Sequence, residues 1–105
     1  MLKYLGGRNP RADVAVADLV IIDLYSSSFC AACAATRSVL EEAARLVPAA
    51  EIVERNIAIA PDAAEEAGIR STPTVIVRDA AGAELFRAEG VPTLPQVLTA
   101  LAKAV

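Results

Sequence analysis

The chain has 105 residues, which is enough for one compact domain and too few for two. Hydrophobic residues make up 55% of it but aromatic residues only 4%, so Ala, Val, Leu and Ile must build the core. The formal net charge of −3 argues against nucleic acid or an anionic membrane surface as a partner. We therefore expect a single domain over residues 1–105.

The first 18 residues carry the weakest pattern of the chain. Residues 2–5 are compatible with an edge strand, and residues 10–18 with either a short helix or a strand. This segment lacks the long apolar core of a signal peptide, and the longest apolar run, residues 19–22, is far too short to span a membrane. We expect a cytoplasmic protein that does not contact a membrane.

The rest of the chain alternates between strand and helix patterns. An apolar stripe predicts a helix that ends before Pro48, and Thr93 and Gln96 have the spacing of a capping box. Strands are expected at 19–25, 51–57, 73–79 and 83–89, and helices at 30–47, 61–67 and 93–104, with a hairpin turn at 80–82. This order predicts an α/β fold with a central mixed sheet and helices on both faces.

Both cysteines lie in the stretch SSSFCAACAA, where the first strand leads into a helix. A helix N-terminus favours negative charge, so Cys30 is placed to form a reactive thiolate, whereas Cys33 leans towards the buried stripe. A disulfide between them would close a very small loop and add little stability, which favours a redox pair over a structural bridge. Two alternatives remain: small buried residues in an Ala-rich helix, or part of a metal site shared across a dimer. Two Cys and no His cannot complete a zinc site within one chain.

Three segments resemble the thioredoxin family: VIIDLY…FCAAC, residues 56–74 (NIAIAPDAAEEAGIRSTPT), and Gly90 before the last helix. The resemblance runs from about Val20 to the C-terminus and implies a thioredoxin-like fold. It also implies a cis Thr72–Pro73 bond and a Thr72 backbone that pairs with an extended substrate segment. The approach LYSSSFC is similar to that of glutaredoxins.

The activity that this resemblance implies is that of a small thiol–disulfide oxidoreductase, which reduces or exchanges protein disulfides through a Cys-Ala-Ala-Cys pair. Cys30 would be the nucleophile and Cys33 the resolving cysteine. No cofactor and no metal are expected; a reductase or glutathione would supply electrons, and we expect a monomer. The implied substrate-binding residues are Phe29, Ala31, Ala32, Thr72, Pro73 and Gly90.

Some residues depart from the family pattern. Phe29 stands where Trp is usual, the Ala31-Ala32 dipeptide is unusual, and the chain has no His to stabilise a thiolate. Asp23 is the candidate proton acceptor, but it lies seven positions before Cys30 instead of six, so strand alternation would point it to the other face unless a bulge intervenes. These departures support an alternative: a thioredoxin-fold binding or adaptor module with vestigial or regulatory cysteines.

Overall fold

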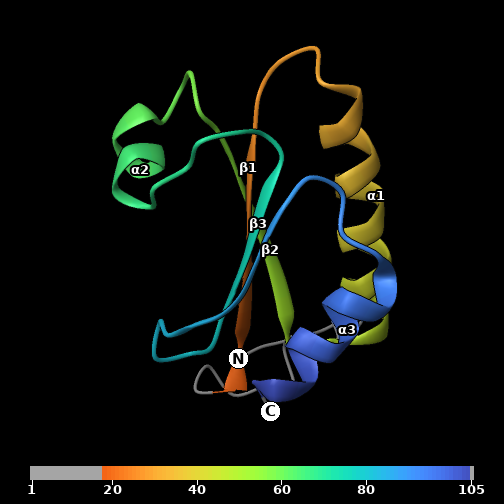
Figure 1. Cartoon of the computed structure of the whole chain (residues 1–105). Coiled ribbons are helices and arrows are strands. Elements are labelled where there is room, and N and C mark those ends of the chain that lie inside the picture. The colour runs from red at the N-terminus through yellow and green to blue at the C-terminus, as the bar shows by residue number, and fades with distance from the viewer. Residues whose placement is uncertain (1–17, 105) are drawn as a thin grey trace, which may run out of the picture.

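The computed structural model describes residues 18–104, and Figure 1 shows how their strands and helices are arranged. The strands are β1 (Val20–Ser26), β2 (Ala50–Asn56), β3 (Thr74–Arg78) and β4 (Glu84–Glu89). The helices are α1 (Ala31–Leu46), α2 (Pro61–Glu66) and α3 (Leu94–Lys103). Every expected strand and helix is confirmed, with each boundary within one residue. The expectations for residues 1–17 lie outside the described part of the chain.

The four strands form one mixed sheet in the order β2-β1-β3-β4. Strands β1 and β2 are parallel, while β1–β3 and β3–β4 are antiparallel, as the sequence order predicts. The β3–β4 ladder shifts register between Val77 and Arg78, which leaves Leu85 on β4 without an opposite residue. No helix within residues 18–104 is long and apolar enough to cross a membrane.

Helices cover both faces of the sheet, as expected. On one face, Ile22 and Leu24 of β1 pack with Leu40 of α1 and Leu101 of α3 in an aliphatic core. The other face holds a smaller cluster around Tyr25 and Ile76, which is covered by α2. Because side chains alternate along a strand, even-numbered residues of β1 face α1 and odd-numbered residues face α2.

Four loops meet at one end of the sheet, drawn at the top of Figure 1. The parallel strands β1 and β2 both end there, β3 begins there, and the antiparallel β4 ends there. The loops are residues 27–30, 57–60, 67–73 and 90–93. The capping box predicted for α3 is confirmed: the Gln96 N–H donates to Thr93 Oγ1 at 3.2 Å, and the Thr93 N–H donates to Gln96 Oε1 at 2.9 Å. This end of the sheet therefore brings distant segments around Cys30.

Candidate functional site

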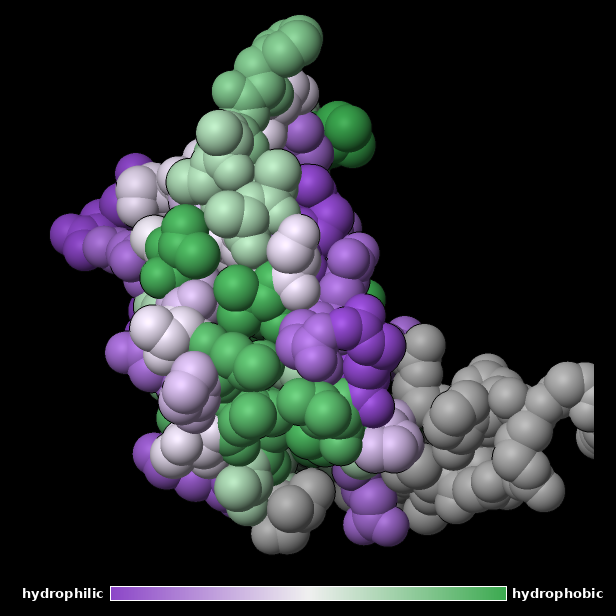
Figure 2. Space-filling model, turned by 90° about the vertical axis from the view of Figure 1, so that its right-hand side faces the viewer, coloured by the Kyte–Doolittle hydropathy of each residue, from purple (hydrophilic) through white to green (hydrophobic). Residues whose placement is uncertain are grey.

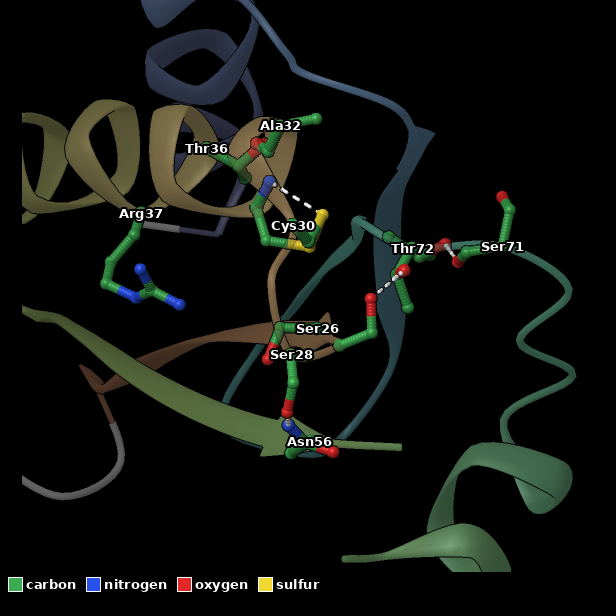
Figure 3. The surroundings of a disulfide bond; sticks show 12 residues. Ser26, Ser28, Cys30, Ala32, Thr36, Arg37, Asn56, Ser71 and Thr72 are labelled. Carbon is green, nitrogen blue, oxygen red and sulfur yellow. Dashed lines mark hydrogen bonds between the residues drawn. A yellow bond between two sulfur atoms is a disulfide. The ribbon is translucent and has the colours of Figure 1, made fainter. Parts of the chain in front are cut away.

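A disulfide joins Cys30 and Cys33 at the start of α1, and Figure 3 shows its surroundings. Cys30 is the N-cap residue, and its Sγ accepts a hydrogen bond of 3.0 Å from the Cys33 backbone N–H. Cys33 is only 1% exposed, whereas Cys30 is half-buried. The first sulfur therefore lies at the surface in the field of a helix N-terminus, and the second is shielded behind it.

Exposed apolar side chains surround this disulfide. Phe29 is fully exposed and has a left-handed backbone with φ of 56°, which is unusual for a bulky residue. Ile59 and Val91, from two of the neighbouring loops, are 83% and 47% exposed. Figure 2 shows weakly hydrophobic residues running up the α1 side of the molecule to its tip, in line with the exposed Ala31 and Ala32. Three of the four exposed large hydrophobic residues of the described chain therefore lie in loops at this end.

The serine run before Phe29 links the site to its neighbours. Ser26 Oγ donates to Glu54 Oε2 at 2.8 Å, and Ser28 Oγ accepts from Asn56 Nδ2 at 3.3 Å. Ser27 Oγ and Thr72 Oγ1 share a hydrogen bond of 2.7 Å. We expected turn and cap chemistry from this run, and the cap part of that expectation is wrong. Cys30 itself caps α1, because its sulfur is the side-chain atom that reaches the Cys33 N–H.

An ion pair lines the pocket beside Cys30. Glu54 accepts from Arg37 Nε at 2.8 Å and from Arg37 Nη2 at 2.6 Å, in addition to its bond from Ser26. The hydrogen bond from Arg37 is the main reason that the pKa of Glu54 lies below its ordinary value; the bond from Ser26 acts in the same direction, and burial opposes both. Glu54 therefore balances the charge of Arg37 in a pocket of about 650 Å³.

Sequence reasoning missed Glu54. Its position on the α1 face follows from its pairing with Leu24, because directly opposite strand residues point to the same side of a sheet. Strand alternation could have placed it on that face, but its contact with Arg37 needs the packing of α1 against β2.

Asp23 lies on the other face of the sheet. Strand β1 pairs with β2 in regular register throughout, so no bulge absorbs the extra residue, and Leu24 occupies the α1 side instead. The Asp23 carboxylate is 4% exposed and accepts hydrogen bonds from Arg55 Nη1 at 2.5 Å and Arg78 Nε at 3.0 Å. Its position away from α1 and Cys33 gives no support to a role as proton acceptor.

The remaining candidate residues lie on the opposite side of the disulfide. The Thr72–Pro73 peptide bond is cis, and the Gly90 N–H donates to the Pro73 carbonyl at 2.9 Å. Gly90 has φ of 92°, a conformation that favours glycine. The fold thus gathers all six candidate substrate-binding residues in the loops and first helical turn around Cys30. The described residues contain no group of three or more His, Cys, Asp or Glu side chains placed to hold a metal ion.

Comparison with known proteins agrees with this arrangement. The profile of the Thioredoxin family matches residues 4–103, nearly the whole chain. A search among curated proteins finds no match.

Similar solved structures are thioredoxins. Chloroplastic thioredoxin z is 22% identical, with a TM-score of 0.71 over 90% of this chain and 87% of that one. The germline-specific thioredoxin Deadhead of Drosophila melanogaster is 20% identical, with a TM-score of 0.73 over 86% and 85%. Thioredoxin-2 of a malaria parasite is 15% identical, with a TM-score of 0.74 over 81% and 82%. At these identities the structures show a shared fold, and the profile match shows the family. The chain belongs to the thioredoxin family.

Proposed function

We propose that this chain is a thiol–disulfide oxidoreductase that reduces or exchanges protein disulfides through Cys30 and Cys33. The observation that carries the proposal is the asymmetry of the pair. Cys30 is accessible at the N-terminus of α1, and Cys33 is 1% exposed three residues further on. An accessible, stabilised thiolate is the attacking species in disulfide exchange, and a shielded second thiol can complete the reaction without competing for substrate.

The reaction then has two exchange steps. The Cys30 thiolate attacks one sulfur of the substrate disulfide; that S–S bond breaks, and the departing sulfur leaves as a thiolate that takes up a proton. Cys33 next loses its proton and attacks the Cys30 sulfur, which releases the second substrate thiol. Two electrons pass to the substrate, and the Cys30–Cys33 disulfide seen here is the oxidised product.

The surrounding loops supply the substrate contacts in this proposal. An extended substrate segment would pair with the backbone at Thr72 and Pro73, in the manner of strand addition. Phe29 and the exposed dipeptide Ala31-Ala32 would pack against its apolar side chains on one side, and Gly90 would leave room for its backbone on the other. We further propose that the protein acts as a cytoplasmic monomer.

Reduction of insulin disulfides by dithiothreitol tests the proposal. The wild-type chain should accelerate it, and Cys30→Ser should abolish the acceleration. Cys33→Ser should lose turnover but retain a trapped mixed disulfide with the substrate, because the first step needs Cys30 alone. Full activity of Cys30→Ser would overturn the assignment. A wild-type chain that forms its disulfide but accelerates nothing would point instead to a binding or adaptor module.

The reduction potential of the pair separates the two electron donors. Equilibration against thiol buffers, followed by counting free thiols, measures it directly. A value near about −270 mV would fit a thioredoxin-like reductant that is served by a reductase, and a value near about −200 mV would fit coupling to glutathione.

A further inference from the structure

The hydrogen bond between Ser27 Oγ and Thr72 Oγ1, at 2.7 Å, joins two loops that are far apart in the sequence. Ser27 lies in the β1–α1 loop that carries Cys30, and Thr72 lies in the loop before β3. Figure 3 draws this bond as a dashed line from Thr72 in the surroundings of the disulfide. Both residues are half-buried, so the bond is partly protected from water.

Other contacts hold the Thr72 loop, but they fix it to different parts of the fold. Thr74 Oγ1 donates to the Ser71 carbonyl at 2.7 Å, which shapes the loop internally. The Gly90 N–H donates to the Pro73 carbonyl at 2.9 Å, which joins the loop to the end of β4. Among residues 18–104, the Ser27–Thr72 bond is the hydrogen bond that connects residues 71–73 to the Cys30 loop.

We propose that the Ser27–Thr72 hydroxyl pair is a positioning element, which holds the Thr72 peptide in a set place relative to the Cys30 sulfur. The inference rests on the proposed function and deepens it. A substrate strand that pairs with the Thr72 backbone can present its disulfide in line with Cys30 only if the two loops keep their relative position. Rates depend steeply on such alignment, since a displacement of about 1 Å can cost on the order of 100-fold.

The pair thus selects for disulfides carried on an extended protein segment. A small disulfide has no strand to pair with Thr72, so it needs only an accessible Cys30. Neither hydroxyl ionises in the working pH range, and the positioning should therefore be insensitive to pH and salt. These expectations distinguish a positioning role from a direct effect of either hydroxyl on the Cys30 sulfur, which would change reactivity towards both kinds of disulfide.

Four variants and one control test the pair. Ser27→Ala and Thr72→Val each remove the hydrogen bond, Ser27→Ala/Thr72→Val removes both partners, and Thr72→Ser keeps a hydroxyl at the same place. Ser71→Ala is the matched control, because the Ser71 hydroxyl forms no hydrogen bond within residues 18–104. Each protein is assayed for kcat/KM with insulin and for the rate at which its reduced form reacts with DTNB.

The two single variants should lose kcat/KM with insulin by on the order of tenfold, with the rate towards DTNB unchanged. The double variant should be no worse than either single variant, because the same bond is lost. Thr72→Ser and Ser71→Ala should behave as wild type. Additive losses in the double variant, equal losses with insulin and DTNB, or an unchanged kcat/KM with insulin would each overturn the inference.

Hydrogen exchange of the oxidised protein provides a readout that needs no activity. Loss of the Ser27–Thr72 bond should accelerate amide exchange in residues 69–72, while Ser71→Ala should leave it unchanged. If the wild-type chain reduces no disulfide, the proposed function fails, whatever the exchange shows. If exchange at residues 69–72 does not respond to Ser27→Ala, the positioning role fails even in an active protein.

Discussion

Replacing Asp23 with Asn tests whether this carboxylate stabilises the fold or serves the disulfide. Asp23 is 4% exposed and pairs with Arg55 and Arg78, so an amide would leave two guanidinium groups without their counter-charge. Breaking a buried ion pair costs about 3–5 kcal/mol. The arginine side chains are 35% and 28% exposed and can regain water, which lowers the expected cost to about 2–3 kcal/mol. For a chain of this size the midpoint of thermal unfolding should fall by about 10–20 °C.

Urea unfolding, thermal unfolding and insulin reduction measure the two effects separately. Asp23→Asn should lower the free energy of unfolding but leave the turnover and its pH profile unchanged at temperatures where the variant is folded, because the carboxylate faces α2. Glu65→Gln is the control, since Glu65 is an exposed acid without an ion pair within residues 18–104. Unchanged stability together with slower turnover would show that Asp23 is the proton acceptor and would refute the structural role.

Three further variants test the core, a turn and an ion pair. Leu40→Ala should lower the free energy of unfolding by about 2–5 kcal/mol in urea titrations, because Leu40 is fully buried. Gly90→Ala should cost about 1 kcal/mol by thermal unfolding, and the cause is its φ of 92°, since an added Cβ meets no atom within 4 Å. Glu54→Gln should lose at most about 1 kcal/mol at pH 7, because its pair with Arg37 is partly exposed. Since the folded pKa of Glu54 is lowered, this difference from wild type should shrink as pH falls below about 4.3.

The elements of this fold were predictable because their signals are local. The capping box of Thr93 and Gln96, the stop at Pro48 and the apolar runs of the strands lie within a few residues of the structure that they specify. The pair Cys30 and Cys33 at a strand-to-helix junction is equally local. Element order then determines which strand ends meet, so the grouping of the loops around Cys30 followed from the sequence as well.

The contacts across the site were not predictable, because they depend on tertiary packing. The partner of Arg37 is Glu54 on a strand that packs beside α1, and no sequence spacing relates the two residues. Asp23 shows the same limit: alternation raised the question of its face, but only the regular β1–β2 register answers it. The serine run looked like turn and cap chemistry, and its bond to Thr72, 45 residues away, has no local signature.

Strand β4 forms an edge of the sheet within the described part of the chain, and its sequence protects that edge from aggregation. Exposed strand edges can pair with those of other molecules, and charges and bulges oppose such pairing. Antiparallel pairing of two copies of β4 in full overlap would set Glu84 of one chain opposite Glu89 of the other, so that like charges meet at both ends. The register shift at Leu85 further interrupts the regular ladder that a second copy would need. Without added protection, the protein can therefore present the loops around Cys30 to extended substrate segments while its own β4 edge resists self-association.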